Sequence, residues 1–167
     1  ALAAADNATT ELTPDLRDYC DQQISSARTD SEKVAAQALK RRLEMAFRTD
    51  RCEVIEKPDG YGKNTGDCGD TVEIFLTVEK ERIQYVSFAI DGCINTRAAA
   101  NTVAEMSEGK HVGQAWRITP DDVANYLETL PADSYHCAEL AVGALYRALT
   151  DYRSKQQNPW KKVYSPR

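Results

Sequence analysis

The chain has 167 residues, of which 42% are hydrophobic and 28% charged, a composition typical of one globular domain with room for a terminal extension. Its net charge of −5 and isoelectric point near 5.1 argue against a nucleic-acid-binding surface, which usually carries a basic face. No apolar run approaches the roughly 18 residues that a membrane-spanning helix needs. We therefore expect no nucleic acid and no membrane among its partners.

The N-terminal third is predicted to be helical after a short irregular start. Residues 1–12 are rich in Ala and Thr without periodicity, and we expect them to be disordered. The Thr-Pro-Asp sequence at 13–15 is typical of a helix start, and apolar residues at helical spacing follow it as far as Ile24. A second helix is predicted from Asp30 to about Arg48.

A β section follows the turn-rich stretch at 57–62. Residues 71–79 alternate between apolar and polar side chains, the period of a half-buried strand. A second alternating run ends at Ile90, and a shorter strand is expected around 60–66. The pattern predicts an antiparallel sheet of about three strands.

The remainder of the chain is again predicted to be helical. One helix should run from Cys93 to a stop at Gly109, and another should begin at Thr119. A break at Pro131 separates these from a last helix over about 133–155. Strands followed by helices predict an α+β fold, with helices packed on one face of the sheet.

Three short stretches of the sequence contain side chains that bind metals, each at a predicted element end. They are Cys68, Asp70, Cys93, His136 and Cys137. Thiolate and imidazole are the ligands that zinc and iron–sulfur clusters prefer. Because element ends can meet at one edge of a fold, we predict that these stretches form a single metal or cluster site.

Ordinary structural roles are the alternative for each residue taken singly. Cysteine is often a small buried hydrophobe, and we expect this of Cys20 and Cys52. Asp70 could form a turn, His136 could cap a helix, and His111 is expected at the surface. The odd number of widely spaced cysteines argues against a disulfide framework and favours a reducing compartment.

The same ligand segments resemble those of the IscU/NifU-like iron–sulfur cluster assembly scaffolds. They contain Asp-Cys68-Gly-Asp70, Asp-Gly-Cys93 and His136-Cys137, and they occur in the family's order. The matching segments are 60–73, 88–100 and 130–141. The resemblance covers about residues 58–153 and implies the family's α+β fold.

Together with the predicted elements, the resemblance divides the chain, and it implies a role for each ligand. The division is a disordered start (1–12), an N-terminal helical extension (13–57), a scaffold domain (58–155) and a C-terminal tail (156–167). Cysteines 68, 93 and 137 match the three cluster ligands. Asp70 matches the aspartate associated with cluster lability, and His136 matches the histidine that can bind iron or replace a ligand.

In such a scaffold, a cysteine desulfurase delivers persulfide sulfur, and Cys137 matches the usual acceptor. Iron and electrons complete a transient 2Fe–2S cluster, which passes to acceptor apo-proteins without turnover of a small-molecule substrate. An electron-donating ferredoxin and a frataxin-like protein are further implied partners. The family's Leu-Pro-Pro-Val-Lys stretch is replaced here by Leu-Pro-Ala-Asp-Ser at 130–134, which argues against the dedicated Hsp70 and J-type chaperones.

Two other functions remain open at this point. The extra N-terminal helices and the aromatic tail fit an accessory or structural subunit of a larger assembly. The same ligand set also suits a zinc protein, since zinc accepts thiolate, imidazole and carboxylate ligands. Because free thiols fit a reducing compartment, we favour a bacterial cytoplasm, or the mitochondrial matrix if the source is eukaryotic.

Overall fold

The structure is a computed structural model that describes residues 14–128 and 130–160. The disorder expected for residues 1–12 and most of the predicted tail lie outside these ranges. The elements in chain order are α1 (Pro14–Ser26), α2 (Asp30–Phe47), β1 (Gly60–Thr65), β2 (Thr71–Glu79), β3 (Arg82–Asp91), α3 (Ile94–Ser107), α4 (Val112–Ala115), α5 (Pro120–Leu127), the 3-10 helix η1 (Ala132–Ser134) and α6 (Tyr135–Gln157). The predicted α+β fold with three antiparallel strands and additional N-terminal helices is confirmed.

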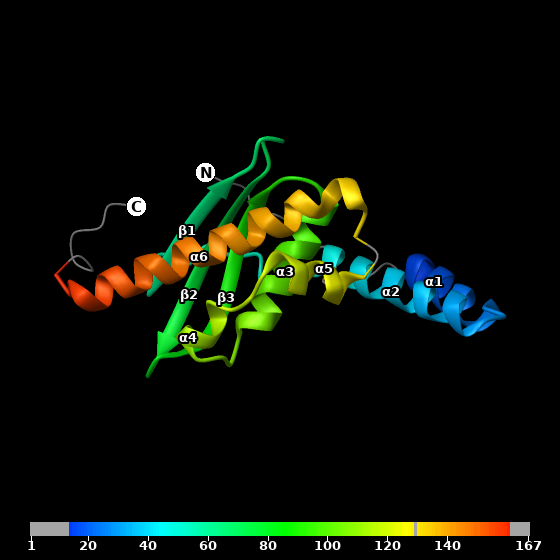
Figure 1. The fold of residues 1–167 in the computed structure, drawn as a ribbon, viewed down its shortest axis with the longest axis horizontal. Helices are drawn as coiled ribbons and strands as arrows, with labels where there is room; N and C mark the ends of the chain where they lie inside the picture. Colours follow the sequence, from blue (N-terminus) through cyan, green and yellow to red (C-terminus); the bar gives the residue numbers. More distant parts are fainter. Residues whose placement is uncertain (1–13, 129, 161–167) are drawn as a thin grey trace.

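The sheet has the order β1-β2-β3 and is covered on one face by α3 and α6 (Figure 1). Most of the side chains pointing to that face from the middle of β2 and β3 are fully buried. They include Val72, Ile74 and Leu76 of β2 and Val86 and Phe88 of β3. The alternation seen in the sequence therefore reflects one face packed against helices, and burial of this apolar surface is the main stabilising contribution.

Close contact between α6 and β1 depends on two glycines of the strand. A Cβ atom at Gly60 or Gly62 would collide with the backbone of α6 at Ala144 and Ala148. Because glycine lacks that atom, the helix backbone lies directly against the strand. The Asn64 side chain then donates a hydrogen bond to the Leu140 carbonyl at 3.1 Å, which fixes the position of α6 along the strand.

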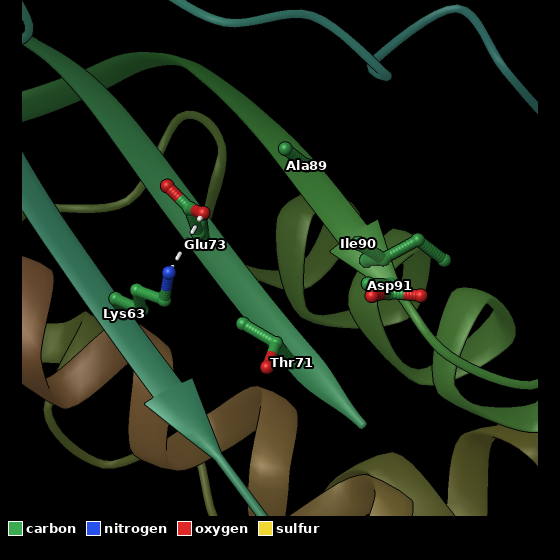
Figure 2. A pocket seen from close by; sticks show the side chains of 6 residues that line it. All are labelled: Lys63, Thr71, Glu73, Ala89, Ile90 and Asp91. Carbon is green, nitrogen blue, oxygen red and sulfur yellow. Dashed lines mark ion pairs between the residues drawn. The ribbon is translucent and has the colours of Figure 1, made fainter. Parts of the chain in front are cut away.

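The opposite face of the sheet has a hollow at one end, lined mainly by polar side chains (Figure 2). Lys63 and Glu73 form an ion pair across β1 and β2, with 3.4 Å between Nζ and Oε1. Thr71 and Asp91 lie beside them on neighbouring strands. None of the five candidate ligands lines this depression.

Helices α1 and α2 form a hairpin that projects from the body of the molecule (Figure 1). A capping box between Thr29 and Glu32 starts α2 at the predicted residue. The far end of α2 is tied to α3, because the Asn101 side chain donates to the carbonyls of Met45 (2.7 Å) and Arg48 (2.9 Å). The extension therefore packs on the domain, and the boundary at residues 57 and 58 stays a prediction.

The two cysteines outside the ligand set differ in their surroundings. Cys20 is buried on α1, as predicted. The prediction for Cys52 was wrong, since this residue is exposed. It follows α2 in a turn where the neighbouring Arg51 is the buried side chain, paired with Glu108 at 2.5 Å.

Two short helices, α4 and η1, were not predicted. His111 is exposed as expected, and it begins α4 by accepting the Gly113 N–H at 3.1 Å. Because η1 occupies Ala132–Ser134, α6 begins at Tyr135. Over residues 14–128 and 130–160, no helix has the length and apolarity needed to cross a membrane.

Candidate metal centre

The first ligand stretch lies in the tight turn between β1 and β2. The Gly66 N–H donates to the Asp70 carbonyl at 2.9 Å, and the Gly69 N–H donates to the Gly66 carbonyl at 3.0 Å. Gly69 has a φ of +88°, which favours glycine because other side chains are strained there. The turn leaves Cys68 exposed and returns Asp70 to the start of β2.

The second stretch ends β3 and begins α3, with Cys93 as the N-cap residue. The Cys93 backbone N–H donates to Asp70 Oδ2 at 3.1 Å, so a carboxylate from the β1–β2 turn contacts the start of this helix. A Cβ atom at Gly92 would lie 2.8 Å from both Cγ and Oδ2 of Asp70. Glycine at this position allows the carboxylate to approach.

The third stretch is the first turn of α6, where Cys137 is fully buried. Its Sγ lies 3.9 Å from Cys93 Sγ. The ligand atoms of Asp70, Cys93 and Cys137 all lie within 4.8 Å of one another. Two thiolates bound to zinc at about 2.3 Å in a tetrahedron are about 3.8 Å apart, so the two thiols already have the spacing that a shared metal ion requires.

The buried hydroxyl of Thr96 lies among these three ligands, and the sequence had not indicated it. Its Oγ1 donates to Asp70 Oδ2 at 2.5 Å and lies 3.3 Å from Cys137 Sγ and 3.4 Å from Cys93 Sγ. Thr96 occupies the third position of α3, one turn after Cys93. That spacing was the one available signal, because residues three apart share a helix face.

The charges of the site follow from these contacts. The hydrogen bond from Thr96, and then that from the Cys93 N–H, lowers the pKa of the Asp70 carboxyl. Burial, reinforced by the neighbouring thiol of Cys93, raises the pKa of Cys137 to about 11, although the hydrogen bond from Thr96 opposes this. In the metal-free centre Asp70 is therefore a carboxylate and Cys137 a neutral thiol at pH 7.

His136 is exposed beside the buried group. Its Nδ1 lies 2.9 Å from the Asp133 carbonyl oxygen, which can only accept, so Nδ1 carries a hydrogen in this arrangement. In the neutral ring Nε2 then presents a lone pair, 3.6 Å from Cys137 Sγ. An imidazole fixed through one nitrogen in this way is the usual form of a metal ligand.

Cys68 is separate from the compact group formed by the other two thiols and Asp70. Its side chain and that of His136 line a neighbouring depression together with Asp67 and Glu139. The described residues thus bring together three of the five predicted ligands and place the remaining two around an adjoining hollow.

The sequence of this chain matches the NifU-like N terminal domain model over residues 54–159. The chain belongs to this family. The match includes all three ligand stretches and excludes α1 and α2.

The chain is also similar in sequence to proteins named as iron–sulfur cluster assembly scaffolds. The chain is 40% identical over 103 residues to "Iron-sulfur cluster assembly scaffold protein IscU 1" of Archaeoglobus fulgidus, covering 60% of this chain and 67% of the relative. It is 32% identical over 106 residues to "Iron-sulfur cluster assembly scaffold protein IscU" of Aquifex aeolicus, covering 62% of this chain and 68% of the relative.

Solved structures support the fold. A NifU-like protein (N-terminal) from Brucella abortus superposes with a TM-score of 0.60 at 17% identity, over 71% of this chain and 97% of that one. A scaffold protein for the SUF system from Fervidobacterium islandicum gives 0.58 at 18% identity, over 66% and 94%. At these identities the likeness establishes the fold alone.

Proposed function

We propose that this protein is an iron–sulfur cluster assembly scaffold. The observation that carries the proposal is the group formed by Asp70, Cys93 and Cys137, with ligand atoms within 4.8 Å, in a chain of the NifU-like family. Two thiols at metal-sharing distance suit iron and sulfide as cargo. The related scaffold proteins of Archaeoglobus and Aquifex support the same function.

In this function the ligands have unequal roles. Cys93 and Cys137 bind the metal from the starts of α3 and α6, and Cys68 joins from the exposed hairpin turn. Asp70 supplies a hard oxygen, which is a weaker partner for a cluster than a fourth thiolate and favours its release. His136 supplies Nε2 as the exchangeable ligand.

Cys137 is the proposed acceptor of sulfur. Once the Cys137 thiol has lost its proton, its thiolate attacks the outer sulfur of the persulfide on a cysteine desulfurase, which leaves a persulfide on Cys137 and a free thiolate on the desulfurase. Iron, sulfur and electrons then form a transient 2Fe–2S cluster that is passed to acceptor apo-proteins. A ferredoxin is proposed as the supplier of electrons, and a frataxin-like protein as a further assembly partner. The proposed location is a reducing compartment such as a bacterial cytoplasm. The chain acts as a scaffold and turns over no small-molecule substrate.

Anaerobic reconstitution tests this proposal. Incubation with iron, cysteine and a desulfurase should give the visible absorbance of a cluster, and Cys93→Ala and Cys137→Ala should lose it. Cys52→Ala is the matched control, because Cys52 is also a free thiol but lies outside the ligand group. Equal loading of all three variants would contradict the assignment.

A zinc protein is the second candidate function. Asp70, Cys93 and Cys137, with His136 Nε2 beside them, form a set of one oxygen, two sulfur and one nitrogen ligands that suits tetrahedral zinc. Elemental analysis of protein purified without oxygen separates the two candidates. Stoichiometric zinc that iron and sulfide do not displace would favour this second function.

A further inference from the structure

The environment of Thr96 is unusual for a threonine in a helix. Its side chain is fully buried, and a buried hydroxyl needs hydrogen-bond partners. A threonine in the body of a helix commonly bonds to the carbonyl four residues earlier, as Thr102 does with Ala98 at 2.8 Å, whereas the residue four before Thr96 is Gly92, outside α3. Thr96 instead contacts three side chains that belong to the proposed metal centre.

The single hydroxyl proton can serve only one acceptor at a time. The Asp70 carboxylate is the strongest acceptor available, and the 2.5 Å separation is typical of a hydrogen bond to a charged oxygen. The sulfur atoms of Cys137 and Cys93 lie farther from the hydroxyl, at 3.3 Å and 3.4 Å, and sulfur is a weaker acceptor than a carboxylate oxygen. Metal binding displaces the protons of the two thiols, whereas the bond from Thr96 to the Asp70 carboxylate involves neither of them.

We propose that Thr96 is a positioning residue for metal uptake, holding the Asp70 carboxylate through Oδ2 beside the two cysteines that share the ion. The Cys93 N–H also donates to Oδ2, so both bonds direct the carboxylate by the same oxygen. Thr96 is not a ligand and acts through Asp70. The inference rests on the proposed function for the nature of the cargo, while the positioning itself applies to any divalent metal that the centre binds.

Zinc affinity measured without oxygen, by competition with a chromophoric chelator, tests this role. Thr96→Val keeps the shape and removes the hydroxyl, and it should lower the affinity about 10- to 100-fold, the usual effect of losing an outer partner of a metal ligand. Thr96→Ser keeps the hydroxyl and should restore most of the affinity. Thr96→Ala also removes the hydroxyl, without adding bulk, and it should show the same loss of zinc affinity. It takes the place of the valine variant in this measurement if Thr96→Val folds poorly.

A double-mutant cycle with Asp70→Ala separates positioning from packing. If Thr96 acts through Asp70, Thr96→Val should change zinc affinity by no more than about twofold once Asp70 is absent. An equal loss in both backgrounds, or failure of the serine variant to recover affinity, would overturn the inference. Failure of the wild-type protein to load a cluster overturns the proposed function instead, because the zinc measurements do not depend on cluster assembly.

Discussion

Replacing Gly92 by alanine should weaken metal binding by displacing Asp70. The new Cβ would lie 2.8 Å from Cγ and Oδ2 of Asp70, whereas carbon atoms in good contact are at least about 3.5 Å apart. The carboxylate must therefore retreat by about 0.7 Å. That movement would lengthen the bond from the Cys93 N–H, now 3.1 Å, beyond hydrogen-bonding range.

The cost follows from the charge of the acceptor. A hydrogen bond to a charged group contributes about 1.5–3 kcal/mol, and the lower end applies because Asp70 is partly exposed. About 1.4 kcal/mol corresponds to a tenfold change in affinity, so Gly92→Ala should bind zinc roughly tenfold more weakly. Gly92 does not have a positive φ, so alanine introduces no backbone strain of its own.

Chelator competition for zinc at pH 7, with thermal unfolding measured alongside, checks the effect. Gly113→Ala is the matched control, because a Cβ there would meet only His111, no closer than 3.4 Å, away from the ligands. If Gly92→Ala folds normally and binds zinc as tightly as the wild type, Asp70 does not contribute to the site in the way proposed.

Three further outcomes are expected. Gly62→Ala should lower the free energy of unfolding by about 3 kcal/mol, the upper end of the range for overpacking, because the new Cβ would collide with the α6 backbone at Ala144. An unchanged midpoint of urea unfolding would be inconsistent with this contact. Glu108→Gln should lower stability at pH 7 by about 1–2 kcal/mol. Burial raises the pKa of Glu108, but the hydrogen bond from Arg51 and further favourable contacts outweigh it and leave the pKa below its ordinary value. The greater stability of the wild type should therefore be complete above about pH 4.5 and shrink as the pH falls below it. A stability difference between the two proteins that stays constant down to pH 3 would exclude this pairing. Cys20→Ala should leave cluster absorbance after reconstitution unchanged, since this thiol is buried on α1, outside the ligand group.

The regular elements could be predicted because each has a periodic or capping signal in the sequence. The alternation over residues 71–79 gave the bounds of β2 as the structure has them. Thr119 begins α5, as predicted, through a capping box with Asp122. Helices of three or four residues, such as α4 and η1, have no period to detect.

The ligand types were predictable for a chemical reason, while their arrangement was not. Few side chains bind soft metals, so Cys93, Cys137 and His136 are conspicuous in a chain of any fold. Threonine has no such chemistry, and Thr96 acquires a role only because tertiary packing buries it between a carboxylate and two thiols. The separation of Cys68 from the compact group likewise depends on the β1–β2 turn, whose geometry periodicity does not specify.

The geometry of the metal centre depends on close packing at Gly60 and Gly62, in a distant part of β1. In the sequence they belong to a turn-rich stretch, but in the structure they lie within β1 and admit the backbone of α6. That contact, together with the bond from Asn64 to the Leu140 carbonyl, sets the register of α6 along the strand. Cys137 lies less than one turn before Leu140, so the 3.9 Å spacing to Cys93 Sγ depends on this register. A helix displaced along β1 by one residue would move about 1.5 Å and separate the two thiols from metal-sharing distance.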